Sequence, residues 1–280
     1  MSGRLSPFNL VSLVVGFAFL YLPIVLLVIF SFNESKLVTV WAGFSTRWYV
    51  QLFQNQALLD AAWVTIRVAL ISATVATVLG TFAALAMTRY TRFRGRMLFS
   101  GMIYAPLVMP EVITGLSLLL LFVSLEQFIG WPEGRGMTTI TIAHITFTMA
   151  FVAVIVQSRL VSLDESIEEA AMDLGARPAK IFFVITLPII SPAIVSGWLL
   201  AFTLSLDDLV IASFVSGPAS TTLPMVIFSS VRLGVTPEIN ALATIIVALV
   251  TTGIIVAGVF MARQERIRKQ DEQMAASSNA

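Results

Sequence analysis

The stretch SLDESIEEAAMDLGARPAKIFFVITLPIISP, residues 162–192, is the one long charged interruption in a mostly apolar chain. Ser162 followed by Glu165 fits a capping box, which predicts that a helix begins at this point. An apolar stripe at helical spacing follows, opposite an acidic face, and consists of Ile167, Ala170, Ala171 and Leu174. The first part of the stretch therefore predicts an amphipathic helix whose apolar face can pack against another surface.

The second part of the stretch predicts another helix after a sharp turn, and we call the two helices together with this turn the elbow. Gly175 is typical of a helix C-terminus, and Pro178 suits the first turn of the helix that follows. We expect this second helix to carry Lys180 through Leu187 and to end or bend at Pro188 and Pro192, because proline removes a helical hydrogen bond.

Seven residues of the stretch stand at a spacing that resembles the EAA loop of ABC-importer permeases: Glu169, Ala170, Ala171, Gly175, Ile185, Leu187 and Pro188. In that family the loop is a cytoplasmic coupling helix that sits in a groove of the ATP-binding subunit. The resemblance implies the same role here for the Glu-Ala-Ala triplet and the glycine. The alternative is a helix that lies on the bilayer surface, but such helices favour Lys and Arg on the polar face and this face is acidic.

The composition outside this loop is that of a multi-pass membrane protein, since 58% of the 280 residues are hydrophobic and only 12% are charged. No repeat or linker divides the chain, so we expect one all-α transmembrane domain over residues 1–280, with a cytoplasmic loop at 162–190. Apolar runs of about 20 residues or more can cross a bilayer, and the chain has six: Phe8–Phe32, Ala61–Thr88, Leu98–Leu125, Thr139–Ser158, Ala193–Phe214 and Ala241–Met261. The first run has no convincing cleavage site and predicts an uncleaved span.

The distribution of Lys and Arg predicts the orientation of the chain. With both termini in the cytoplasm, twelve of the seventeen basic residues lie on the cytoplasmic side: Arg4, Arg89, Arg92, Arg94, Arg96, Arg159, Arg177, Lys180, Arg263, Arg266, Arg268 and Lys269. Four lie outside and one, Arg67, lies within the second span. This bias independently places the elbow in the cytoplasm. Outside, Leu223 to Leu233 has helical spacing and predicts a short interfacial helix.

Three acids within the apolar runs are candidates for a solute path, because ionisable groups at membrane depth normally face a bundle interior or a wet cavity. They are Glu111, which follows two prolines in the third run, and the neighbours Asp207 and Asp208 in the fifth. A net negative cavity favours a cationic solute. Adjacent helical residues point about 100° apart, so at most one aspartate can face a central path. The alternative is that these acids pair with Arg67, with free helix amides or with water.

The sequence GWLLAFTLSLDDLVIASFVSGPASTTLP at 197–224 and the run APLVMPEVITGLSLLLLF are similar to the polyamine branch of ABC-importer permeases. The resemblance implies a MetI-like type I importer fold in the bacterial inner membrane and the import of putrescine, spermidine or both. It also implies a second permease subunit, two ATP-binding subunits that use ATP and Mg²⁺, and a periplasmic polyamine-binding protein. This chain itself would bind no cofactor.

Other functions find less support in the residues. No glycine precedes a lysine, so a Walker A motif is absent and a partner must hydrolyse ATP. His144 is the sole histidine and Cys is absent, which excludes a multi-histidine or thiolate metal site; we expect His144 to be a hydrogen-bonded packing residue. A secondary transporter for a cationic solute and an intramembrane aspartyl protease remain alternatives, but both leave the elbow unexplained.

Overall fold

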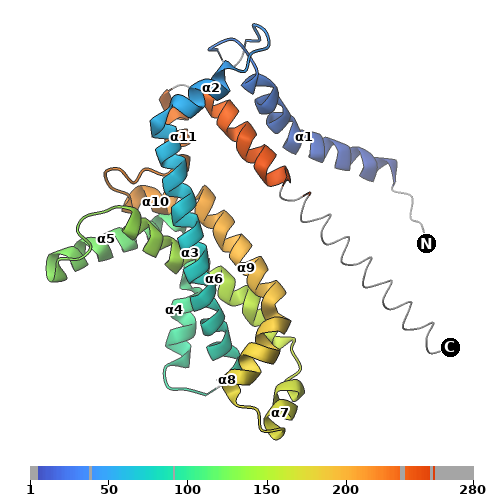
Figure 1. Cartoon of the computed structure of the whole chain (residues 1–280), viewed down its shortest axis with the longest axis vertical. Helices are drawn as coiled ribbons and strands as arrows, with labels where there is room; N and C mark the ends of the chain where they lie inside the picture. The colour runs from blue at the N-terminus through green and yellow to red at the C-terminus, as the bar shows by residue number, and fades with distance from the viewer. Residues whose placement is uncertain (1–5, 38–39, 91, 234–236, 253–254, 256–280) are drawn as a thin grey trace. The chain divides into compact units, whose positions relative to one another are not determined.

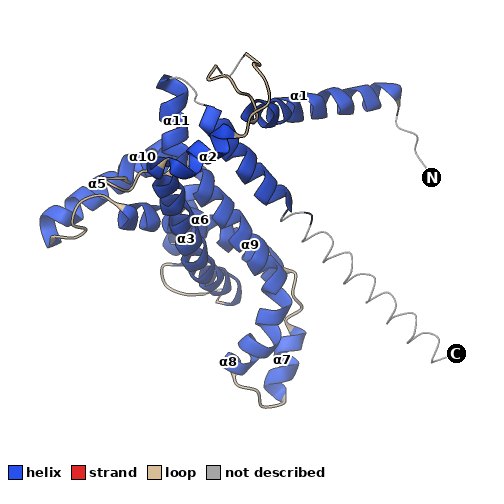
Figure 2. Cartoon of the chain, turned by 45° about the horizontal axis from the view of Figure 1, so that its top comes forward, coloured by secondary structure: helices blue, strands red, loops and turns tan. Residues whose placement is uncertain are grey.

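A computed structural model describes residues 6–37, 40–90, 92–233, 237–252 and 255 of the chain. Within these ranges the structure consists of helices and loops without a strand (Figure 2). Asn33 and Phe44 form an isolated bridge. The chain forms two compact units, one from residues 1–56 and 230–280 and the other from residues 57–229. The predicted all-α class is confirmed.

The unit formed by the chain ends contains α1 (Pro7–Ser31), α2 (Arg47–Gln54) and a helix at Pro237–Thr252. α1 buries only Ser31, which suits a helix whose apolar side chains meet lipid. The Asn33 side chain ties the following loop together, since its amide donates to the Val40 carbonyl at 2.7 Å and its oxygen accepts from the Ala42 N–H at 2.9 Å. The predicted sixth span, Ala241–Met261, falls partly outside the described residues.

The unit formed by residues 57–229 holds the other helices, except that α3 begins one residue before it and α11 ends four residues after it. These helices are labelled in Figure 1. In chain order they are α3 (Gln56–Arg89), α4 (Arg96–Val108), α5 (Glu111–Ile129), α6 (Met137–Val161), α7 (Ser166–Asp173), α8 (Pro178–Ile181), the π-helical turn η1 (Phe182–Thr186), α9 (Leu187–Asp207), α10 (Val210–Val215) and α11 (Leu223–Leu233). Of the described helices, five are long and apolar enough to cross a membrane: α1, α3, α5, α6 and the continuous helix Pro178–Asp207. The helix expected at Leu223 to Leu233 is confirmed as α11.

Small residues let α3 and α9 approach α6 closely. A Cβ added to Gly80 of α3 would lie 2.9 Å from the Met149 carbonyl oxygen, and one added to Gly197 of α9 would lie 3.3 Å from Val152 Cγ1. The Ser72 hydroxyl donates to the Thr141 carbonyl at 3.1 Å across the same contact. Because lipid supplies no hydrophobic force between helices, close packing and interhelical hydrogen bonds of this kind hold the bundle together.

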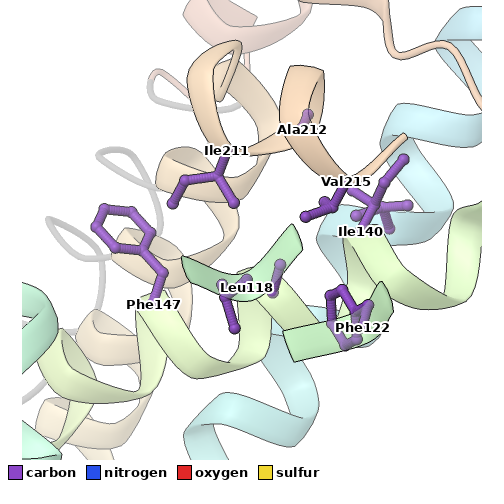
Figure 3. Close-up of a cluster of buried hydrophobic side chains, with 9 residues drawn as sticks. Leu118, Phe122, Ile140, Phe147, Ile211, Ala212 and Val215 are labelled. Atoms are coloured by element: carbon purple, nitrogen blue, oxygen red, sulfur yellow. The ribbon is translucent and has the colours of Figure 1, made fainter. Parts of the chain in front are cut away.

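A cluster of buried apolar side chains joins α5, α6 and α10 (Figure 3). Figure 3 shows the side chains of all three helices meeting: Leu118, Phe122, Ile140, Phe147, Ile211, Ala212 and Val215. Gly115 permits the contact, since a Cβ there would lie 2.8 Å from Phe214 Cδ2 and 3.3 Å from Ile211 Cα. α5 is thereby fixed against the short helix α10.

Two of the apolar runs, Leu98–Leu125 and Ala193–Phe214, each contain a break in the helix. The first helix stops at Val108, where Met109 is extended with ψ 135° before Pro110. A residue before proline is pushed out of the α region, and proline donates no hydrogen bond. The second stops at Asp207, and Asp208 is extended with ψ 126° before α10 begins. Both breaks directly precede a new helix.

We expect Gly80→Ala to destabilise the bundle, because the new methyl group meets a backbone oxygen that cannot move aside. Overpacking of this kind costs about 1–3 kcal/mol. Thermal unfolding of the purified chain in detergent measures the effect. Gly101→Ala is the matched control, since Gly101 is also helical and a Cβ there meets nothing within 4 Å. Equal stability of the two variants would contradict the packing argument.

Candidate functional site

The turn after α7 has the hydrogen bonds of a Schellman motif. The Ala176 N–H donates to the Ala171 carbonyl at 3.0 Å, and the Gly175 N–H donates to the Met172 carbonyl at 2.8 Å. Gly175 has φ +81°, the left-handed conformation that this motif requires and that glycine adopts without strain. The predicted stop at Gly175 is therefore present, and the next helix begins at Pro178 as expected.

The start of α7 differs from the prediction, and the capping box at Ser162 and Glu165 is wrong. α6 runs to Val161, so Ser162 ends that helix and its hydroxyl donates to the Arg159 carbonyl at 2.8 Å. α7 begins at Ser166, whose N–H donates to the Asp164 carboxylate at 3.0 Å. This bond to the Ser166 backbone lowers the pKa of Asp164 below its usual value.

Of the two outcomes expected at Pro188 and Pro192, an end or a bend, the second helix of the elbow does not show an end. It continues through Pro188 and Pro192 to Asp207, but its backbone widens over Phe182–Thr186, where the Leu187 N–H donates to the Phe182 carbonyl five residues back. The missing N–H of Pro188 removes a normal helical bond immediately after this turn. Three residues of the EAA pattern, Ile185, Leu187 and Pro188, thus lie at or next to a π-turn.

The apolar stripe of the elbow has no cover within the described residues. No residue of α7 is buried, and its flanking Leu174 is 89% exposed. Glu169 and Ala170 are exposed and Ala171 is half-buried. A hollow of about 490 Å³ follows the stripe, lined by Ala171, Leu174, Gly175, Ala176, Arg177 and Lys180. An uncovered apolar surface flanked by charges is typical of a protein contact.

An ionic contact that the sequence analysis missed connects α7 with α3. Arg89, the last residue of α3, lies 2.6 Å from the Glu165 carboxylate and 3.1 Å from that of Glu168. The Thr186 hydroxyl in the π-turn also donates to Glu168, at 2.6 Å. Periodicity within one helix carries no signal for a contact between residues so far apart in the chain.

The two neighbouring aspartates lie in different surroundings. Asp208 is buried, and its carboxylate accepts hydrogen bonds from the Ile211 N–H at 3.2 Å and the Ala212 N–H at 2.7 Å, which caps α10. His144 Nε2 lies 3.1 Å from the same carboxylate, while His144 Nδ1 lies 2.6 Å from the Ser205 hydroxyl. Asp208 thus fits the alternative in which an acid pairs within the protein, and His144 is the hydrogen-bonded residue that the sequence analysis expected.

Asp207 and Glu111, by contrast, are exposed. Glu111 is the first residue of α5 and Asp207 the last of α9, so each stands at one of the two breaks. Gly115, one turn after Glu111, packs against Ile211, which follows Asp207 by about one turn. The Ile211 N–H also donates to Asp208, the neighbour of Asp207, so Gly115 and Ile211 connect the two breaks. Among the described residues, no three His, Cys, Asp or Glu side chains could hold a metal ion.

The family model described as "Binding-protein-dependent transport system inner membrane component" matches residues 76–269. The chain therefore belongs to this family of multi-pass transporter subunits, and it is a non-catalytic membrane subunit. It is 63% identical over 270 residues to the Escherichia coli (strain K12) "Putrescine transport system permease protein PotI", with 96% of each chain covered. The "Spermidine/putrescine transport system permease protein PotC" of the same strain is 45% identical over 233 residues, covering 83% of this chain and 86% of PotC.

Solved structures of ABC transporters share the fold at low sequence identity. A bacterial ABC transporter that imports the acidic polysaccharide alginate matches with a TM-score of 0.69 at 18% identity, covering 93% of this chain and 99% of that chain. The MetNI methionine ABC transporter matches with a TM-score of 0.57 at 17% identity, covering 74% and 94%. The resemblance to ABC-importer permeases and the MetI-like fold are confirmed.

We expect His144→Leu to lower the free energy of unfolding by about 1.5–3 kcal/mol, the usual worth of a hydrogen bond to a charged group. The loss arises because the buried carboxylate of Asp208 loses its ring partner. Thermal unfolding in detergent measures it. Adding Asp208→Asn should restore part of the stability, since a neutral amide costs less to bury than an unpaired charge. Independent, additive losses in the double variant would contradict the pairing.

Proposed function

We propose that this chain is the permease subunit of an ATP-driven importer that moves polyamines, putrescine and/or spermidine, across the bacterial inner membrane. The observation that carries the proposal is the 63% identity over 96% of the chain to a permease named for putrescine transport. The exposed acids at the two helix breaks support a cationic solute. A secondary transporter for a cationic solute would also need acids at membrane depth, but it would have no use for the uncovered elbow.

The elbow is the proposed contact with the ATP-binding subunits. Glu169, Ala170, Ala171 and Gly175 would sit in a groove of that subunit, and the uncovered stripe supports this role because burying it releases apolar surface from water. Ile185, Leu187 and Pro188 would pass the movement of the elbow to α9. The ATP-binding subunits, present in two copies, would bind and hydrolyse ATP with Mg²⁺.

Glu111 and Asp207 are the proposed solute-facing acids. Both are exposed and each lies where a membrane helix stops or starts, so a protonated amine could reach them. Asp208 belongs to the same candidate path, but its carboxylate is already bonded to α10 and His144, so we assign it the role of holding the break in place.

The proposed assembly follows from the same resemblance. A different permease subunit would pair with this chain, and a periplasmic binding protein would deliver the polyamine from outside. The excess of Lys and Arg near the elbow supports cytoplasmic N- and C-termini. In this orientation ATP-driven movement of the elbow would alternate the exposure of the path.

Gly175→Val should abolish coupled uptake, since a β-branched residue is not tolerated at φ +81° and the elbow would change direction. ATP-driven uptake of radiolabelled putrescine into vesicles with the complete set of subunits measures this. Gly134→Val is the matched control, because Gly134 has φ +75° but lies in the loop before α6, outside the elbow. Equal loss in both variants would show that strain alone, and not the elbow, explains the defect.

Glu111→Gln combined with Asp207→Asn should lower putrescine uptake by about tenfold or more, because a field of complementary sign raises the local cation concentration at least that much. The same vesicles provide the measurement, with ATP hydrolysis and subunit assembly unchanged. Asp60→Asn is the control, since Asp60 is an exposed acid in the first turns of α3, an unbroken helix. Normal uptake in the double variant would remove these acids from the path.

A further inference from the structure

Three elements meet at a single carboxylate oxygen of Glu168. Arg89 Nη2 at the end of α3 lies 3.1 Å from Glu168 Oε1, and the Thr186 hydroxyl in the π-turn donates to the same oxygen at 2.6 Å. Arg89 Nη1 also lies 2.6 Å from Glu165 Oε1. We call Arg89, Glu165, Glu168 and Thr186 the Arg89 network. It links α7, the helix that carries the Glu-Ala-Ala triplet, to two membrane helices.

The two acids of the Arg89 network differ in their exposure to solvent. The side chains of Arg89 and Glu168 are 17% and 16% exposed, and Thr186 is 2% exposed, whereas the Glu165 side chain is 64% exposed. Water and salt screen an exposed ion pair, so its contribution is small, but a partly buried pair retains more of its attraction. The Glu168 contact is therefore the one that can hold the helix in place.

No buried side chain of α7 holds this helix in position, so its position depends on these ionic contacts. α7 has eight residues and none of them is buried. Its covalent connections are a short turn after α6 and the turn at Gly175. An apolar pocket of about 470 Å³ lies beside the network, lined in part by Phe82, Leu85, Ile181, Phe182 and Phe183, so side chains do not fill the space between α3 and the elbow. The contacts to Glu168 bridge this space.

The guanidinium of Arg89 has few other partners. Within the part of the chain that the structure describes, its Nε atom is buried without a hydrogen bond, and its Nη2 contact with Glu168 is an ion pair without aligned hydrogen-bond geometry. Removal of the Glu168 charge would leave the cation with only the exposed carboxylate of Glu165. The position of Arg89, and with it the end of α3, depends on Glu168.

We propose that Glu168 is a positioning residue that fixes α7 to the end of α3 and to the π-turn before α9. A movement imposed on α7 then reaches both membrane helices through Glu168 as well as along the chain. The inference rests on the proposed function, in which the ATP-binding subunit acts on α7. It assigns to Glu168, which precedes the Glu-Ala-Ala triplet, a contact within the permease rather than with the ATP-binding subunit.

The first test measures how firmly α7 is held, without any transport. The chain has no cysteine, so a spin label at Asp173→Cys reports on α7 alone in the full-length chain in lipid nanodiscs. Adding Glu168→Gln or Arg89→Gln should raise the mobility of the label clearly. Glu165→Gln is the matched control, since it removes the exposed partner of the same arginine, and it should change mobility little. Equal mobility of the Glu168→Gln and parent labels would overturn the proposal.

The second test measures coupling in the complete importer, as putrescine taken up per ATP hydrolysed. Glu168→Gln should lower this ratio about tenfold, which corresponds to a loss of about 1.4 kcal/mol when the partly buried guanidinium of Arg89 loses the charge of its partner, while hydrolysis and assembly persist. Arg89→Gln should lower it similarly, and the double variant no further, because both act through one contact. Losses that multiply in the double variant, or an equal loss in Glu165→Gln, would overturn the proposal. Absence of uptake in the wild-type importer would instead refute the proposed function and leave the spin-label result standing.

Discussion

Backbone amide and carbonyl groups have no water to bond within a bilayer, so a membrane helix can stop only where other groups replace its hydrogen bonds. Asp208 meets this constraint at the start of α10, directly after α9 ends, since its carboxylate accepts from two N–H groups of α10. Burial of that charge would be costly on its own, and the His144 ring lies against it, itself bonded to Ser205. The placement of α10, of α5 packed upon it, and of the exposed acids at both breaks depends on this one set of contacts.

Much of the fold follows from patterns that are local in the sequence. The first apolar run, predicted at Phe8–Phe32, forms α1 at Pro7–Ser31, and Gly175 was placed correctly because few other residues tolerate its φ of +81°. The break at Asp208 was missed because hydropathy averages over many residues and one or two non-helical residues leave no trace in it, whereas the break at Met109 lies beside the prolines of the third run. The hydrogen bond from the Ser166 N–H to Asp164 at the start of α7 was missed because the start of α7 depends on where α6 ends.

The candidate site was less predictable, for a different physical reason. The sequence indicated which residues are charged at membrane depth and that Asp207 and Asp208 point in different directions. It could not indicate that Asp208 faces His144, 64 residues away, or that Glu165 meets Arg89 across 76 residues. Contacts of this kind depend on how helices pack against each other. Close packing of small residues stabilises the contacts of α3 and α9 with α6, whereas ion pairs with Arg89 hold α7. Salt therefore weakens the second kind of contact but not the first.

The π-turn at Phe182–Thr186 has a geometric consequence for the elbow. A π-turn holds one residue more than an α-turn, and each residue of a helix turns it by about 100°. The direction in which α7 and α8 project from α9 is thus set by the number of residues in this turn as well as by their chemistry. A single-residue deletion or insertion there would rotate the whole elbow about the helix axis while leaving its sequence intact. Relatives of this chain can therefore share every residue of the elbow and still differ in the direction from which a partner must approach it.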